Sequence, residues 1–123
     1  MNLKGRYWAF IVYPESAPDN WIDILSEMGV VGAISPLHDQ DTNPDGTEKK
    51  PHYHIVIEFE GPTTYKHVHE NICESVNGTI PKRVISLRGY YRYLTHMDNP
   101  EKAQYDQNDV KQIGGFKLEL TTK

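Results

Sequence analysis

The sequence has 123 residues, of which 37% are hydrophobic and 24% are charged, and its formal net charge is -4. This length suits one domain whose modest core needs neither disulfides nor a metal to hold it together. No apolar run is long enough to cross a bilayer, and the single cysteine, Cys73, excludes an internal disulfide. We therefore expect one globular domain in a reducing cytoplasm. The acidic balance is unfavourable for binding phosphates but does not exclude it, because the placement of basic residues matters more than their total.

The first part of the chain predicts a strand, a helix and a second strand. Residues 6–13 form a nearly continuous aromatic and β-branched run, which is typical of a central strand. Residues 21–28 carry apolar side chains at helical spacing, and Gly29 is a stop signal for that helix. The apolar residues 30–34 then predict a second strand.

The remaining elements complete an α+β pattern. Residues 52–59 predict a strand that ends at a Gly61-Pro62 break, residues 65–76 an amphipathic helix, and residues 82–87 a further strand. Apolar residues alternate at Phe116, Leu118 and Leu120, which favours a last edge strand. We expect an antiparallel sheet of about five strands with helices packed on it, of the split βαβ or ferredoxin-like type.

Two histidines stand out on the strand over residues 52–59. His52 and His54 point to the same face because side chains alternate along a strand, and their Cα atoms are then roughly 6.5 Å apart. Both rings are able to reach one metal ion at that spacing. Taken alone, the pair is equally compatible with two solvent-facing histidines on a half-buried strand.

The segment before this strand supplies two further metal-ligand candidates. The run Asn43-Pro44-Asp45-Gly46 is a strong turn signal, and a hairpin across it places His38 and Asp41 beside His52 and His54. Imidazole and carboxylate donors without thiolates suit Mn²⁺, Mg²⁺, Co²⁺ or Zn²⁺ in a site with an open position. An ordinary solvated acidic loop is the alternative interpretation.

Three tyrosines fall within four positions in the segment 87–97. On a helix, Tyr90 and Tyr91 lie in one apolar arc with leucines and a methionine, whereas Tyr93 projects at its edge beside His96. A phenol outside the core with arginines and a histidine nearby suits a nucleophile that attacks phosphate. A surface tyrosine on an amphipathic helix is the simpler alternative. The candidate DNA-phosphate contacts are the basic residues Lys49, Lys50, Lys82, Arg83, Arg88 and Arg92.

Four motifs follow one another in an order that is more specific than any one of them. They are Tyr13-Pro14-Glu15-Ser16, Ala33-Ile34-Ser35-Pro36-Leu37-His38-Asp39-Gln40-Asp41, His52-Tyr53-His54 and Tyr91-Arg92-Tyr93-Leu94-Thr95-His96. Over most of its length the chain resembles the catalytic, origin-binding domain of rolling-circle plasmid replication initiators, the RepB type of the HUH endonuclease superfamily.

This resemblance implies a role for each candidate residue. His52 and His54 match the two histidines of the metal motif, whereas His38 and Asp41 match the additional ligands of one Mn²⁺ or Mg²⁺ ion. Tyr93 matches the nicking tyrosine. Many superfamily members carry a lysine three residues after that tyrosine, where this chain has His96, so the role of His96 is left open.

The resemblance also implies a function for residues 1–123 as a single origin-binding and nicking domain in the bacterial cytoplasm. Tyr93 would attack one strand of the origin, leaving a 5′-phosphotyrosine and a free 3′-OH, and strand transfer would later resolve the adduct. The expected partners are duplex origin repeats and the single-stranded nick site, with no membrane. We expect a C-terminal oligomerisation domain to be missing from this chain.

Two other functions explain some of the same residues. A noncatalytic DNA- or RNA-binding module would use Tyr7, Trp8 and Phe10 as a stacking platform and leave the histidines incidental. A metal-dependent hydrolase would use the same ligands with an activated water in place of Tyr93. A covalent protein–DNA adduct separates the nickase from both.

Overall fold

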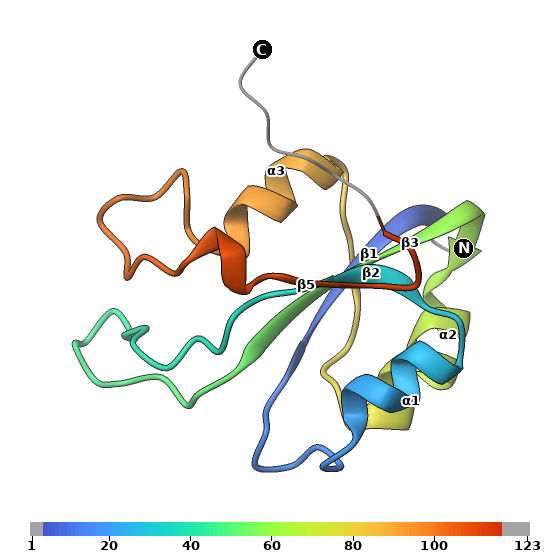
Figure 1. Ribbon diagram of the computed structural model, residues 1–123, viewed down its shortest axis with the longest axis horizontal. Helices are drawn as coiled ribbons and strands as arrows, with labels where there is room; N and C mark the ends of the chain where they lie inside the picture. The colour runs from blue at the N-terminus through green and yellow to red at the C-terminus, as the bar shows by residue number, and fades with distance from the viewer. Residues whose placement is uncertain (1–3, 117–123) are drawn as a thin grey trace.

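A five-stranded antiparallel sheet organises the computed structural model, which describes residues 4–116 (Figure 1). The strands follow the order β4-β1-β3-β2-β5, and they are β1 (Lys4–Val12), β2 (Val31–Ile34), β3 (Tyr53–Thr64), β4 (Lys82–Arg83) and β5 (Lys111–Ile113). The helices are α1 (Trp21–Glu27), α2 (Tyr65–Val68) and α3 (Leu87–Tyr93). The predicted α+β class is therefore confirmed. Within residues 4–116, no helix is long and apolar enough to cross a membrane.

Helices cover both faces of the sheet (Figure 1): α1 and α2 lie on one face and α3 lies on the other. The alternation along β3 explains this arrangement, because Ile55 and Ile57 enter the larger apolar cluster with residues of α1 and α2. Val56 points the opposite way and packs with Tyr91 of α3 and with Leu94, which directly follows α3. The face that carries α3 is also the face of His52 and His54.

The central strand β1 belongs to the core. Trp8 is 0% exposed and Phe10 is 2% exposed, and both lie in the larger apolar cluster. Their rings therefore have no free face on which a base could stack. The interpretation of Trp8 and Phe10 as part of a stacking platform is therefore wrong, whereas Tyr7 is half-buried.

The strand β3 and the helix after it correct one prediction and confirm another. β3 continues through Gly61 and Pro62 to Thr64, because this stretch pairs with β1 beyond a register shift between Gly5 and Tyr7. Proline and glycine are tolerated at such an irregularity. The predicted helix over residues 65–76 is present as α2, a π-helical turn (His69–Cys73) and a 3-10 turn (Glu74–Val76), and the left-handed residue Asn77 ends it.

The last predicted elements are shorter than expected. β4 ends at Arg83, because Ser86 caps α3 and accepts a hydrogen bond from the Gly89 amide at 3.0 Å. α3 stops at Tyr93, and His96 has a positive φ of 60°. The edge strand is β5, a short 3-10 turn (Gln107–Asp109) precedes it, and it pairs with β2. Of the predicted alternation, Phe116 is buried, whereas Leu118 and Leu120 lie outside the described residues.

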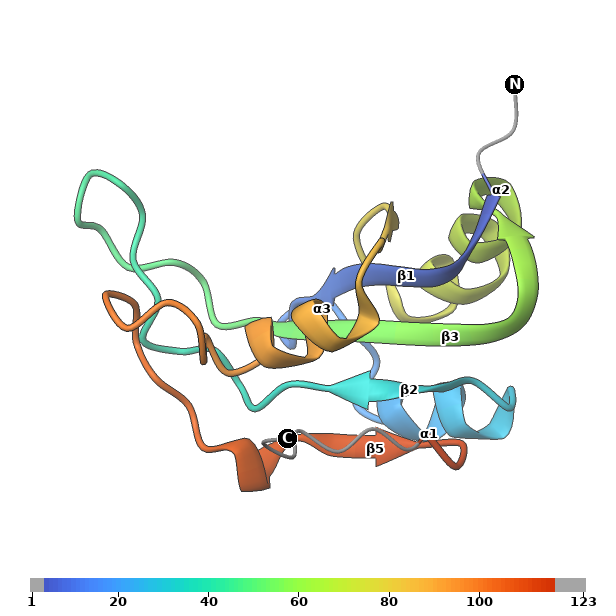
Figure 2. The same ribbon diagram turned by 90° about the horizontal axis from the view of Figure 1, so that it is seen from above.

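Two long connections meet at one end of the sheet. Figures 1 and 2 show the segment between β2 and β3 and the segment after α3 extending side by side beyond the strands. The two segments are residues 35–52 and residues 94–106, and hydrogen bonds join them. We call the second segment the strap.

Candidate metal centre

The hairpin between β2 and β3 brings the two predicted histidine motifs together. His38 and His52 form an antiparallel bridge, in which the His38 amide donates to the His52 carbonyl at 2.8 Å and the His52 amide donates back at 3.2 Å. Ser35 fixes the backbone of His54, because its hydroxyl oxygen accepts a hydrogen bond from the His54 amide at 2.9 Å. The register therefore aims all three imidazoles at one point.

Four side chains converge at this point, and they are the four that the sequence nominated: His38, Asp41, His52 and His54. One ligand atom from each lies within 4.8 Å of the other three. The residues are 0 to 8% exposed. Buried charged or polar groups are costly unless they are paired or coordinate a metal, so this cluster needs a cation or a proton at its centre.

The two ring nitrogens of His38 have different partners. Nε2 lies 2.7 Å from the carbonyl oxygen of Leu94, which only accepts, so Nε2 carries the proton. Nδ1 lies 2.9 Å from Oδ2 of Asp41. In the neutral imidazole, this leaves a nitrogen lone pair and a carboxylate oxygen facing each other, an arrangement that requires a cation or a proton between them. The donor set of His38 and Asp41 fits a metal ion.

The other two histidines are oriented in a similar way. His52 donates from Nδ1 to the Lys50 carbonyl at 2.7 Å, so its Nε2 lone pair faces Oδ2 of Asp41 at 3.4 Å. His54 Nδ1 lies 3.5 Å from the Tyr90 hydroxyl. Burial, assisted by the charges of His38 and His52, lowers the pKa of His54 to about 3. Its imidazole is therefore neutral at physiological pH, which is the form that binds metals.

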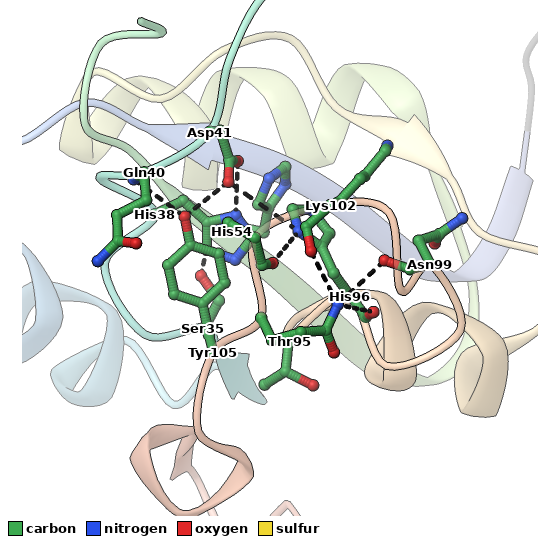
Figure 3. Close-up of polar contacts among 12 residues, drawn as sticks. Ser35, His38, Gln40, Asp41, His54, Thr95, His96, Asn99, Lys102 and Tyr105 are labelled. Atoms are coloured by element: carbon green, nitrogen blue, oxygen red, sulfur yellow. Dashed lines mark hydrogen bonds and ion pairs between the residues drawn. The ribbon is translucent and has the colours of Figure 1, made fainter.

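The strap contributes a tyrosine to the carboxylate of the cluster (Figure 3). The Tyr105 hydroxyl donates to Oδ1 of Asp41 at 2.6 Å and accepts from the Gln40 amide at 3.1 Å. Its ring stacks on His38, with centroids 4.1 Å apart and planes inclined by 17°. Burial opposes ionisation of Asp41, but the hydrogen bond from Tyr105, together with that from the protonated form of His38, outweighs it and holds the pKa of Asp41 below its ordinary value. The carboxylate is thus ionised and oriented.

His96 lies in the same cluster rather than on the surface. It is buried, its ring centroid is 4.8 Å from that of His38, and Nδ1 donates to the Ala103 carbonyl at 2.9 Å. The positive φ that turns the chain after α3 places the ring there. Figure 3 shows His96 beside Lys102 and Asn99 of the strap. His96 is therefore a residue of the strap that packs against the candidate metal ligands.

Tyr93 borders the pocket that contains the cluster. This pocket has a volume of about 520 Å³, and Asp41, His52, His54 and Tyr93 all line it. The Tyr93 ring meets the His54 ring edge-on at a centroid distance of 5.2 Å. The ammonium of Lys102 lies 5.6 Å from the centre of the Tyr93 ring. A phenol, three of the four metal-ligand candidates and a cation therefore line one cavity.

Comparisons with known proteins identify the family of this chain. The family model described as "Plasmid replication protein, origin binding domain" matches residues 1–119. The chain belongs to this family. It is 51% identical over 116 residues to replication protein RepB of Lactiplantibacillus plantarum, and 42% identical over 122 residues to a replication protein of Staphylococcus aureus. These matches cover 94% and 99% of this chain, but only 52% and 61% of the two relatives.

The basic residues of this origin-binding domain are in different environments. Lys49 and Lys50 line the pocket of about 520 Å³ described above, which we call the metal pocket. Lys50 also forms an ion pair with Glu15 at 2.6 Å. Arg92 is engaged by both carboxylate oxygens of Asp98. Arg88 is exposed on α3. Lys82 and Arg83 on β4 line a second groove, which His54 and Tyr93 also line.

Sequence reasoning missed two residues of the origin-binding domain that touch this site. Tyr105 and Lys102 belong to an irregular segment, where no periodicity indicates the direction of a side chain. The only local signal was the polar break at Asp98-Asn99-Pro100, which marks the start of the strap.

Proposed function

We propose that this origin-binding domain nicks one strand of the plasmid origin, in rolling-circle replication in the bacterial cytoplasm, by attack of Tyr93 on the scissile phosphate. The observation that carries the proposal is the position of Tyr93 at the wall of the pocket that Asp41, His52 and His54 also line, with His38 buried behind them in the same cluster. A nucleophile and a cluster able to hold a divalent ion must flank one phosphate for such a reaction. Both are present at the same cavity.

The environments of the neighbouring tyrosines favour Tyr93 over them. Tyr91 is buried, accepts a hydrogen bond from the Gln112 amide at 2.9 Å and stacks on Phe116, so it belongs to the core. Burial, with a smaller contribution from Tyr93, raises the pKa of Tyr90 above its ordinary range and makes its phenolate harder to form. Tyr93 is half-buried and faces the cavity.

The reaction that fits this site is an in-line transesterification. The phenolic oxygen of Tyr93 bonds to phosphorus while the bond from phosphorus to the 3′-oxygen breaks. The phenol proton is lost, the 3′-oxygen gains a proton, and the products are a 5′-phosphotyrosine and a free 3′-OH. The Lys102 ammonium lies 5.6 Å from the centre of the Tyr93 ring, so a cation stands beside the attacking group.

The cluster would hold one Mn²⁺ or Mg²⁺ ion through His38, Asp41, His52 and His54. Such an ion neutralises charge on the phosphate oxygens and orients the phosphate. The chain's own contribution is to keep the imidazoles neutral, the carboxylate ionised and all four donors in place. The covalent ester keeps the energy of the cleaved bond, so attack by a 3′-OH reverses the step and joins strands.

We also propose that the complete replication protein binds duplex origin repeats and oligomerises. The chain spans 52 to 61% of the length of the two curated relatives described above. The remaining part of such a protein is able to supply an oligomerisation domain.

The test is an incubation with a single-stranded oligonucleotide that spans the nick site of the cognate origin, followed by denaturing electrophoresis. The unmodified protein should form a covalent protein–DNA band in Mn²⁺ that disappears with EDTA. Tyr93→Phe should form none, whereas Tyr91→Phe should retain the band if the protein is folded. His52→Ala with His54→Ala should abolish the band as well.

Two outcomes would contradict the proposal. A band from Tyr93→Phe would assign the nucleophile elsewhere, with Tyr90 as the next candidate. Cleaved DNA without any covalent band would support the hydrolase alternative, in which water replaces Tyr93.

A further inference from the structure

A second groove begins where the metal pocket ends. It has a volume of about 600 Å³ and lies on the α3 face of the sheet, between β1, β4, the segment of residues 79–86 and α3. Figure 1 shows that segment rising past the strands to the start of α3. Ile11, His54 and Tyr93 line both this groove and the metal pocket. The two cavities are therefore parts of one surface with Tyr93 at their boundary.

One wall of the groove exposes large apolar side chains to water. Ile85 is 79% exposed and Ile80 is 58% exposed, and both line the groove. Tyr90 lies on the α3 side, with its ring centroid 5.4 Å from that of Tyr93. Exposed aliphatic groups beside an aromatic ring favour a ligand with a flat apolar part.

The same groove has positive charge without opposing negative charge. Lys82 and Arg83 are exposed on the edge strand β4 and line it. Arg83 donates to the Lys4 carbonyl at 3.2 Å, but neither cation pairs with a carboxylate within residues 4–116. In that part of the chain, no Asp or Glu lines the groove. The groove is thus apolar on one side and cationic on the other, in a domain whose net charge is -4.

We propose that this groove binds the single-stranded DNA adjoining the scissile phosphate. A base rests against Ile80, Ile85 and Tyr90, and the sugar–phosphate backbone passes Lys82 and Arg83. This inference rests on the proposed function, because Tyr93 sets where the scissile phosphate lies. The nucleotide next to that phosphate then enters the groove at Tyr90.

Two observations favour a single strand over a duplex as the occupant. A duplex keeps its bases stacked and paired, so it has no free base face to cover Ile80 and Ile85, whereas an unpaired base has one. The groove volume of about 600 Å³ is also in the range of sites for single small molecules, which corresponds to about one or two nucleotides. Lys82 and Arg83 therefore contact the strand to be cut rather than the duplex repeats.

The test compares binding of a fluorescein-labelled thymidine dodecamer with binding of a duplex of the same length, by anisotropy over a range of salt concentrations. Ile85→Ser should weaken single-strand binding by about fivefold, as expected if a base covers roughly half of the side chain. Lys82→Ala should make the plot of log affinity against log salt shallower by about 0.7, the value for one phosphate contact in a single strand. Duplex affinity should change less than twofold in both variants.

Two exposed residues away from the groove supply matched controls. Met28→Ser removes an exposed apolar side chain after α1, and Lys66→Ala removes a cation from α2. Neither should alter single-strand binding. Unchanged single-strand affinity in both Ile85→Ser and Lys82→Ala, or an equal loss for duplex DNA, would overturn the proposal.

The result is distinguishable from failure of the nicking proposal. If no covalent adduct ever forms but Ile85→Ser and Lys82→Ala still weaken single-strand binding, the groove stands and the nickase does not. If the adduct forms and the two variants bind normally, the nickase stands and the groove does not.

Discussion

Removing one hydroxyl group from the strap should weaken metal binding. Tyr105 donates to Oδ1 of Asp41 at 2.6 Å, and this bond keeps Oδ2 directed at His38 and His52. Tyr105→Phe deletes the donor and retains the ring that stacks on His38. The carboxylate is then free to rotate away from the imidazoles.

The expected loss of metal affinity follows from the role of the Tyr105–Asp41 hydrogen bond, which orients a metal ligand. Loss of a hydrogen bond that orients a metal ligand typically lowers metal affinity by about 10- to 100-fold. This range corresponds to about 1.4 to 2.7 kcal/mol. A hydrogen bond to a charged group contributes about 1.5 to 3 kcal/mol, so the two figures are consistent.

The assay is calorimetric titration of the domain with MnCl₂ at neutral pH. Tyr65→Phe is the matched control, because the Tyr65 ring packs against Trp8 and its hydroxyl has no hydrogen-bond partner within residues 4–116. The control should bind Mn²⁺ as the unmodified domain does. A dissociation constant for Tyr105→Phe within twofold of the unmodified value would refute the reasoning.

Three other predictions concern the metal and the core. Mn²⁺ at 100 times its dissociation constant should stabilise the domain by about 2.7 kcal/mol in thermal unfolding, and Asp41→Asn should remove most of this gain. Burial raises the pKa of Cys73 to about 12. Its thiol should therefore react with a disulfide reagent at pH 8 only as fast as the domain unfolds, and rapid reaction in the native state would contradict its burial. Gly32→Ala should lower stability by about 1 to 3 kcal/mol in denaturant unfolding, because the added Cβ would lie against the Val56 carbonyl oxygen, whereas Gly61→Ala, with no atom within 4 Å, should not.

The hairpin part of the site was predictable from sequence because short-range rules determine it. The alternation of His52 and His54 follows from the period of a strand, and the turn signal at Asn43-Pro44-Asp45-Gly46 indicates which residues face them. The structure brings His38 and Asp41 to those histidines through the bridge between His38 and His52. No long-range information was needed for this arrangement.

The strap was not predictable by the same rules. His96 turns the chain with a positive φ, which is uncommon for a non-glycine residue, and the Tyr105 hydroxyl bonds to Gln40 and Asp41, which are more than 60 positions away. The edge strand β5 was missed because three residues are too few to show a period. The boundaries of β3 and β4 depended on a bulge and on the Ser86 cap, which are properties of the local backbone.

The hydrogen bonds that join the strap to the hairpin also bear on the order of folding. The His38–Leu94 bond closes a loop of 56 residues, and the Tyr105–Asp41 bond closes one of 64. Contacts between such distant residues form after local ones, because the entropy of closing the loop opposes them. The β2–β3 hairpin is therefore expected to form before the strap reaches it. Slow opening of the strap, measurable by hydrogen exchange, would then set how fast a bound ion leaves an otherwise folded domain.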